Sequence, residues 1–304
     1  MSALDAPGFP RAAQSSTADH EPVVLEARNV EFDWANLPFH YVPGEPLPTH
    51  VLNALHMLLP AGEEYFVAVF KEVLPLIKDD QLRLDVLGFI GQESMHSRAH
   101  YGVVDHFAAA GVDLKPYTAQ VKWMFDKLLG AGPRRDPRRR QKWLLDQVAF
   151  IAAIEHHTAI LGEWILDSPA LDAAGANPVM LDMLRWHGAE EVEHKAVAFD
   201  TMKHLRAGYF RQARAQLIVA PALLLLWIRG IRFMFSKDPY LPPGTKARWR
   251  DYVSAVRRGL VPSVLRSLWS VLSYYRPGFH PSELGGLELA VDYLAVSPAA
   301  RVAH

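Results

Sequence analysis

Apolar residues recur every three to four positions along most of this chain, which is the spacing of amphipathic helices. Runs that alternate apolar and polar residues, as strands do, are not found in the sequence. Prolines and glycines divide the pattern, as at Pro60, Gly111 and the stretch from Pro169 to Pro178. The pattern therefore predicts an all-α protein, with helices over residues 49–58, 62–77, 80–110, 115–130, 138–166 and 177–205.

Three regions of the chain differ in character. Residues 1–24 are rich in Pro, Ser and Ala and are predicted to be a flexible tail. Residues 25–208 carry the helical pattern and are predicted to form the main helical bundle, although their first part is proline-rich and is expected to wrap the outside. Residues 209–304 are predicted to form hydrophobic and amphipathic helices that pack on the bundle.

The last of these regions contains an unbroken apolar run over residues 217–228. A membrane-spanning helix needs about 20 apolar residues, so this shorter run predicts a buried or interfacial helix. Residues 257–276 mix Arg, Trp, Tyr and Leu. An amphipathic helix packed on the core is the favoured interpretation of that segment, and a helix lying in a membrane interface is the alternative.

Polar residues lie on the apolar face of one predicted helix. In the segment WHGAEEVEHKAVAFD, the helical spacing places His187, Glu191 and His194 on the stripe that also carries apolar residues. Glu190 lies at the edge of this stripe and Glu193 faces away. Because the apolar stripe is the side of a helix that packs inward, we expect the first three side chains to be buried and Glu190 to orient one of them.

The segment FIGQESMHSRAHYGVV repeats this arrangement on another helix. Glu93 and His96 share an apolar face, with the same Glu-x-x-His spacing as Glu191 and His194. His100 follows one turn later on that face. We expect it to contact the site or line a pocket rather than to bind a metal ion.

Two further helices each place a single carboxylate inward. Glu155 shares its face with small residues, which leave room beside it, and the neighbouring His156 and His157 point elsewhere. Glu63 shares its face with Phe and Val side chains, whereas Glu64 faces solvent. The helical phase thus selects Glu63 over its neighbour.

Four converging buried carboxylates would repel one another without a compensating charge, and no inward basic residues accompany them. A pair of metal ions supplies that charge, as in helical bundles with one Glu from each of two helices and Glu-x-x-His from the other two. The chain has 14 histidines and no cysteine, so the ligands are nitrogen and oxygen atoms. Such a site favours two iron ions, with Mn/Fe or manganese as the next candidates.

The motifs PAGEEYF, GQESMH, EHHTA and WHGAEEVEHKAVAFD resemble a bacterial family described as predicted metal-dependent hydrolases, over residues 25–275. Their order also resembles the ferritin-like di-iron superfamily, which implies a four-helix bundle in which Glu93 and Glu191 approach both metal ions. The position of His187 is similar to that of an additional histidine in bacterial arylamine N-oxygenases. That resemblance implies seven metal ligands: Glu63, Glu93, His96, Glu155, His187, Glu191 and His194.

The predicted function is that of a di-iron oxidoreductase, an oxygenase, oxidase or desaturase that uses dioxygen on an apolar small molecule or lipid. A dinuclear metal-dependent hydrolase is the alternative, and a metal-storage protein is less favoured. The electron donor is undefined, and the sequence leaves a peripheral membrane contact and a homodimer open. The net charge of −1 gives no basis for nucleic-acid binding. The N-terminus lacks an apolar signal segment, so a cytoplasmic location is expected.

Overall fold

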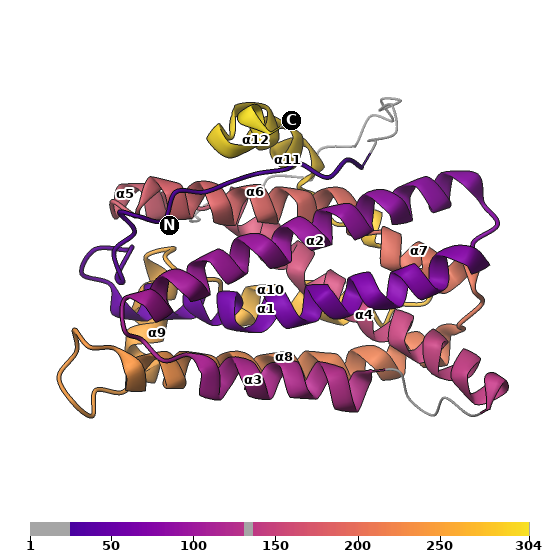
Figure 1. Ribbon diagram of the computed structural model, residues 1–304, viewed down its shortest axis with the longest axis horizontal. Coiled ribbons are helices and arrows are strands. Elements are labelled where there is room, and N and C mark those ends of the chain that lie inside the picture. Colours follow the sequence, from indigo (N-terminus) through magenta and orange to yellow (C-terminus); the bar gives the residue numbers. More distant parts are fainter. Residues whose placement is uncertain (1–24, 131–135, 304) are drawn as a thin grey trace, which may run out of the picture.

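A computed structural model describes residues 25–130 and 136–303, and the predicted tail over residues 1–24 lies outside this part. The described residues form helices and contain no strand, which confirms the all-α prediction. Four core helices run along the long axis of the molecule (Figure 1). They are α1 (Pro46–Val73), α2 (Asp80–Ala109), α4 (Pro137–Leu166) and α6 (Pro178–His194). Helix α1 contacts α2 and α4, and α6 contacts the same two helices, so the four enclose a common interior.

The core helices begin at residues suited to that position. Asp79 accepts a hydrogen bond from the Leu82 amide at 2.8 Å and caps α2. Asp136 and Asn177 cap α4 and α6 in the same way, each followed by a proline in the first turn, where its missing N–H is not needed. These caps fix where α2, α4 and α6 start, whereas α1 begins without a side-chain cap.

Two predicted helix boundaries are wrong. The expected break at Pro60 is absent, because α1 continues through this proline and buries residues from both of its halves in the core. Tertiary packing therefore outweighs the hydrogen bond that proline removes. The helix predicted over 177–205 is instead two helices. Helix α6 ends at His194, and the Lys195 side chain turns inward to donate to the Leu284 and Gly285 carbonyl groups.

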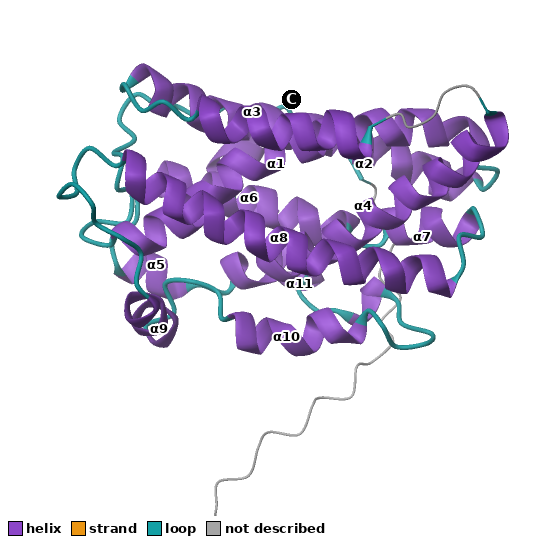
Figure 2. Ribbon diagram, turned by 90° about the horizontal axis from the view of Figure 1, so that it is seen from below, coloured by secondary structure: helices purple, strands orange, loops and turns teal. Residues whose placement is uncertain are grey.

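The shorter helices surround this core. Helix α8 (Tyr209–Lys237) packs against α1 and α4, and α10 (Val264–Ser273) lies beside it, as Figure 2 shows. By length and composition, α8 is the one described helix that is long and apolar enough to cross a membrane. The others are α3 (Lys115–Trp123), α5 (Pro169–Ala173), α7 (Val197–His204), α9 (Trp249–Arg257), α11 (Leu287–Val296) and α12 (Pro298–Val302), with short 3-10 or π turns at Leu74–Leu76, Met124–Leu129 and Pro281–Glu283.

The segment before α1 has no regular secondary structure and runs along the outside of the core helices, as expected (Figure 1). It is nevertheless part of the fold, because Val30, Phe39 and Tyr41 are buried. The Tyr41 carbonyl group accepts a hydrogen bond from the Asn177 amide at 2.7 Å, at the start of α6. This segment therefore ties α1 and α6 together from outside.

Candidate metal centre

The structure brings all seven predicted ligand residues together between the core helices. Each of the four helices contributes at least one carboxylate, and every one of the seven residues is buried. Glu64, which the helical phase placed outside, is exposed and accepts a hydrogen bond from Lys122. The seven are Glu63 on α1, Glu93 and His96 on α2, Glu155 on α4, and His187, Glu191 and His194 on α6.

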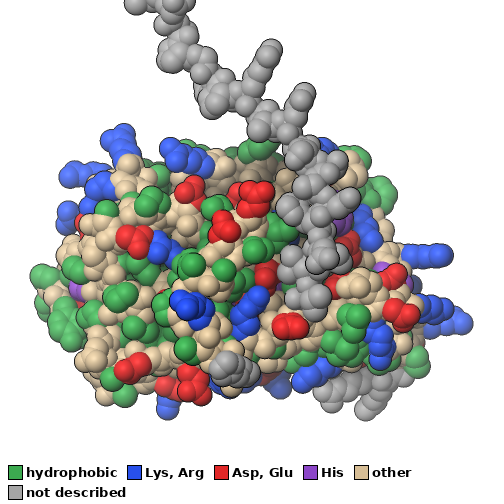
Figure 3. Space-filling model, turned by 90° about the horizontal axis from the view of Figure 1, so that it is seen from above, with side chains coloured by type: hydrophobic (Ala, Val, Ile, Leu, Met, Phe, Trp, Pro, Cys, Tyr) green, Lys and Arg blue, Asp and Glu red, His purple; other side chains and the backbone are tan. Residues whose placement is uncertain are grey.

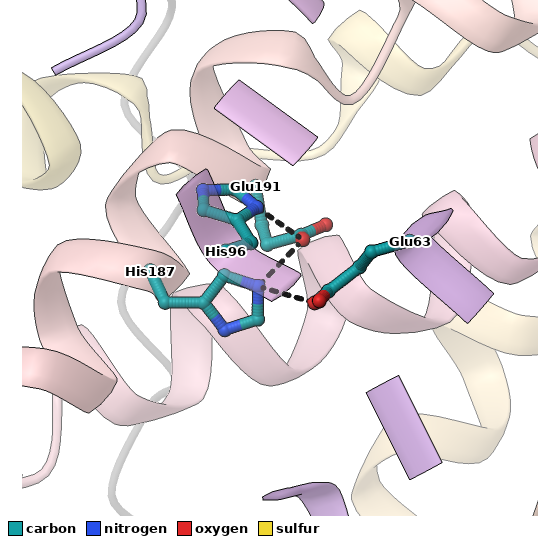
Figure 4. A group of neighbouring side chains, drawn as sticks. All are labelled: Glu63, His96, His187 and Glu191. Atoms are coloured by element: carbon teal, nitrogen blue, oxygen red, sulfur yellow. Dashed lines mark hydrogen bonds and ion pairs between the residues drawn. The ribbon is translucent and has the colours of Figure 1, made fainter. Parts of the chain in front are cut away.

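One group of four side chains consists of Glu63, His96, His187 and Glu191 (Figure 4). The ligand atoms that they offer all lie within 4.8 Å of one another. His187 Nε2 is 2.9 Å from Glu191 Oε1 and 3.5 Å from Glu63 Oε1. His96 Nδ1 is 3.6 Å from Glu191 Oε1. Two imidazoles and two carboxylates thus converge on one point.

A second group consists of Glu93, Glu155, Glu191 and His194, again with ligand atoms within 4.8 Å of one another. His194 Nε2 lies 3.3 Å from Glu155 Oε2, 3.3 Å from Glu191 Oε2 and 3.5 Å from Glu93 Oε1. This group holds three carboxylates and one imidazole, so it is more acidic than the first.

Glu191 joins the two groups. Its Oε1 faces the imidazoles of His96 and His187, and its Oε2 faces His194. Glu93 belongs to the second group alone, which differs from the expectation that it would approach both ions. Residues three apart on a helix are offset by about 4.5 Å along its axis. That offset lets Glu93 serve the second group while His96 serves the first.

The interior of this cluster contains polar atoms that no protein group satisfies. Both carboxylate oxygens of Glu63, Glu93 and Glu155 are buried and lack a hydrogen-bond partner among the described residues. The same holds for Glu191 Oε2, His96 Nδ1 and His194 Nε2. Buried polar groups are normally paired, because an unpaired one costs about 1–3 kcal/mol. Two cations bound between the groups would satisfy these atoms, so the residues present fit a dinuclear metal site.

The electrostatics point the same way. Burial raises the pKa of Glu63, Glu93 and Glu155 well above the usual range, and nearby carboxylates raise it further. Burial would also raise the pKa of Glu191, but the charge of the nearby His194 and the hydrogen bond from His187 hold that pKa well below its usual range. The protein groups alone leave most of this cluster short of positive charge.

His96 is held by residues outside the two groups. Its Nε2 donates to Glu190 Oε2 at 2.9 Å, which leaves Nδ1 facing the centre. Glu190 Oε1 accepts hydrogen bonds from Arg28 at 2.7 Å and from the Trp186 indole at 3.1 Å. The predicted orienting contact of Glu190 is therefore present. The hydrogen bond from Arg28 to Glu190 was not predicted. Arg28 lies in the irregular segment before α1, and helical periodicity gives no information about that segment.

His100 extends the first group, as expected, without joining it. Its Nε2 lies 3.3 Å from His187 Nδ1, and its Nδ1 lies 2.7 Å from His56 Nδ1. His56 is buried two α1 turns before Glu63 and was missed. Its position on the same helical face as Leu52, Pro60 and Glu63 was the available signal. His187, His100 and His56 thus form a buried chain of imidazoles that orients the ring of His187.

Two glycines bring α4 and α6 close together beside the site. A Cβ atom added to Gly162 would lie 2.4 Å from the Gly188 carbonyl oxygen, closer than such atoms can approach. The small residues around Glu155, which were expected to leave room, are therefore partly used for this helix contact. The close approach lets Glu155 on α4 and His194 on α6 meet at the centre.

A separate cluster of potential ligands was not predicted. His40 Nε2 and His50 Nε2 lie 2.6 and 2.8 Å from the same Asp238 Oδ2. Asp238 Oδ1 accepts a hydrogen bond from the Tyr240 amide. In contrast to the main centre, this cluster leaves no atom of His50 or Asp238 without a partner. Hydrogen bonds alone account for it, and it fastens the irregular segment to the end of α8.

An apolar passage reaches the first group. A cavity of about 40 Å³ is lined by His187 and Glu191 together with Leu55, Leu161 and Trp227. It adjoins a cavity of about 280 Å³ that shares these three apolar residues and opens between α8 and α10. On the side of His187, the surroundings of the centre are therefore almost entirely apolar from the inner cavity out to the surface.

The comparisons with known proteins agree with a metal-dependent function. The searches of curated proteins and of solved structures gave no match. A family model described as predicted metal-dependent hydrolase matches residues 26–285, which contain all seven predicted ligands. That description favours the hydrolase alternative over the predicted oxidoreductase. Because the match covers most of the chain, this protein belongs to the family of predicted metal-dependent hydrolases.

Proposed function

We propose that the seven buried side chains bind two metal ions and that the protein is a dinuclear metal-dependent hydrolase acting on an ester with an apolar acyl chain. The observation that carries this proposal is the set of buried carboxylate oxygens and imidazole nitrogens without hydrogen-bond partners. Their arrangement as two groups sharing Glu191 supports two ions rather than one. The family description supports hydrolysis.

Two bound ions would polarise the acyl oxygen of the substrate and lower the pKa of a water molecule. Hydrolysis adds water across the acyl C–O bond, which breaks to give a carboxylic acid and an alcohol. The protein positions the substrate for this reaction, because the passage ends against His187 and Glu191. Leu55, Leu161 and Trp227 surround the acyl chain and exclude bulk water beside it.

Other side chains hold the ligands in place. Glu190 and Arg28 fix the ring of His96, and His100 fixes the ring of His187. The Thr158 hydroxyl group lines the passage but donates to the Glu155 carbonyl oxygen at 3.1 Å. It is therefore occupied within α4 rather than free to bind the substrate.

The direct test is metal-supported ester cleavage. Metal-free protein loaded separately with zinc, manganese or ferrous iron is mixed with p-nitrophenyl acetate and p-nitrophenyl decanoate, and release of p-nitrophenol is followed. We expect turnover that depends on the metal and prefers the longer chain. The control Glu64→Gln should retain it, whereas Glu191→Gln should lose it. Turnover that is unchanged in Glu191→Gln would contradict the proposal.

The donor set favours a second candidate, an iron-dependent oxidoreductase that uses dioxygen. Four glutamates and three histidines, without an aspartate, form a site richer in glutamate than hydrolase sites usually are. The dry, apolar passage also suits an unactivated organic substrate. Protein loaded anaerobically with ferrous iron and then exposed to oxygen separates the two candidates. An oxygen-dependent near-ultraviolet or visible absorption band, without ester cleavage under any metal, would favour oxidation over hydrolysis.

A further inference from the structure

Helix α8 exposes large apolar side chains along its middle and buries two glutamines against the core. Gln212 and Gln216 are buried against the core, whereas Leu217 and Leu225 are 67% and 62% exposed. The inner side is firmly held, because the Trp227 indole donates to the Val51 carbonyl group at 2.7 Å. A helix on the water-facing surface of a protein normally exposes polar side chains instead of leucines. The outer face of α8 is therefore built for an apolar environment.

Helix α10 lies beside α8 (Figure 2) and also exposes large apolar side chains. None of its residues is buried, and Leu265 and Trp269, one turn apart, are 80% and 81% exposed. Its other side is anchored, since His156 donates to the Ser270 carbonyl group at 2.8 Å and Gln216 to that of Val271 at 3.3 Å. His156 thus fastens α10 to α4. We call the exposed side chains of α8, α9 and α10 the α8–α10 face.

This apolar surface lies in a strongly basic region. Residues 209–276 contain twelve lysines and arginines but only two aspartates, whereas the whole chain has a net charge of −1. Four of these arginines form ion pairs with carboxylates of other segments. Arg232, Arg248 and Arg266 are exposed and form no ion pair within the described part of the chain. The opposite side of the molecule is different, because acidic and basic side chains are interspersed there (Figure 3).

Protein surfaces that bind in the interface of an anionic bilayer typically combine exposed leucine and tryptophan with arginine, as this face does. A second copy of the chain fits this face less well. A two-fold dimer would place the same patch on both subunits, so two strongly basic surfaces would meet. The charge therefore selects an anionic lipid surface as the partner.

The α8–α10 face is also where the passage to the metal centre opens. The cavity of about 280 Å³ is lined by Leu224 of α8 and Leu268 of α10, both exposed at the surface. At its inner end it adjoins the cavity beside His187 and Glu191. A chain leaving a bilayer under this face would enter the passage without crossing water.

We propose that the α8–α10 face docks on anionic lipid bilayers and that the passage takes up the acyl chain of a lipid. The docking stands on the exposed face and its charge, and only the use of the acyl chain as a substrate rests on the proposed function. Helix α8 lies flat against α1 and α4, with Arg229 and Arg232 in its second half, so the contact is peripheral and spans no bilayer.

The test is co-sedimentation of the full chain with vesicles of phosphatidylcholine alone or mixed with phosphatidylglycerol. We expect binding to the mixed vesicles that weakens with added salt, and little binding to phosphatidylcholine. The double variant Leu265→Glu/Trp269→Glu should bind about tenfold less. The control Leu84→Glu/Leu87→Glu, which changes two exposed leucines one turn apart on α2, should bind as wild type does.

Two outcomes would overturn the docking proposal. One is an absence of wild-type binding to phosphatidylglycerol vesicles. The other is equal binding by Leu265→Glu/Trp269→Glu, with circular dichroism showing that it is folded. Light scattering, which measures the mass in solution, gives a third such outcome. If the wild type is a dimer and this variant is a monomer, the face serves self-association rather than lipid binding. Cleavage of a soluble ester without vesicle binding would contradict the docking proposal but not the proposed hydrolase activity. Vesicle binding without ester cleavage under any metal would contradict the hydrolase activity but not the docking.

Discussion

Gly162 on α4 and Gly188 on α6 meet so closely that neither position has space for a side chain. A Cβ atom on Gly162 would lie 2.4 Å from the Gly188 carbonyl oxygen, and one on Gly188 would lie 2.6 Å from an Ile165 methyl group. The contact therefore sets the distance between the helix that carries Glu155 and the helix that carries His194. The metal centre depends on this backbone packing as well as on its ligands.

Alanine at Gly162 should separate the two helices. We expect Gly162→Ala to lower the free energy of unfolding by about 1–3 kcal/mol, because the obstacle is backbone and cannot rotate away. It should also weaken metal binding. The control is Gly62→Ala, where the nearest atom is in the Phe125 ring at 3.3 Å, which can shift. Urea unfolding and metal titration of both variants check this, and equal stability would contradict the packing role.

Glu190→Gln should weaken the first metal site without removing a ligand. The change removes the charge that accepts the hydrogen bond of His96 Nε2, and such outer contacts are typically worth about tenfold or more in metal affinity. Glu193→Gln is the matched control, because Glu193 pairs with the same Arg28 but does not contact His96. Competition with a chelator measures both affinities. An equal loss of metal affinity in the two variants would show that the effect comes from the lost pairing with Arg28 rather than from the contact with His96.

Acid should destabilise the fold partly through His50. Burial lowers its pKa to about 4, despite the opposing effect of Asp238, whereas the unfolded chain has a value near 6.5. Between these two pH values the unfolded state binds a proton that the folded state does not. The contribution of His50 to stability is therefore fully present above pH 6.5 and is lost as the pH drops toward 4. The loss for this group is roughly 3 kcal/mol. Urea unfolding at pH 7.5 and 4.5 should therefore show a smaller difference for His50→Gln than for wild type.

His280 serves as a control, because its pKa is shifted in the direction opposite to that of His50. Its hydrogen bond to Asp200 raises its pKa, so its contribution is present at low pH and is lost as the pH rises above 6.5. His280→Gln should therefore increase, rather than reduce, the fall in stability on acidification. A reduction of the same size in both variants would contradict the assignment to His50.

A larger side chain in the passage should affect long substrates selectively. Leu161 lines both cavities, so Leu161→Trp should close the route between the surface and the metal centre. We expect kcat/KM to fall at least about tenfold for p-nitrophenyl decanoate and much less for the acetate. Leu84→Trp, at an exposed position on α2, should leave both unchanged. Equal losses for the two esters would show that the passage does not bind the acyl chain.

The sequence predicts well which carboxylates and imidazoles are buried, because burial follows helical phase. Glu63 and Glu64 differ by a single position, yet one is buried in the centre and the other is exposed beside Lys122. The same periodicity selects Glu191 over Glu193. It works here because the core helices are long and regular, so the phase persists from the apolar residues to the polar ones between them.

Helical periodicity does not predict contacts between segments that are distant in the sequence. Arg28 reaches Glu190 from a segment without regular structure, and His40 and His50 meet Asp238 across nearly the whole described chain. The continuation of α1 through Pro60 likewise depends on neighbours that hold both halves in place. Helix α10 contacts α4, in line with the favoured prediction of a helix packed on the core, but none of its residues is buried, which its amphipathic pattern did not predict.

The number of metal ions per chain tests the central claim most directly. Metal-free wild type, Glu191→Ala and Glu64→Ala are saturated with ferrous iron or manganese under anaerobic conditions, freed of excess metal and analysed by mass spectrometry of the metal. We expect two ions per chain in wild type and in Glu64→Ala, and fewer than one in Glu191→Ala, because Glu191 belongs to both groups. Two ions retained in Glu191→Ala, or none bound by wild type, would contradict the dinuclear centre.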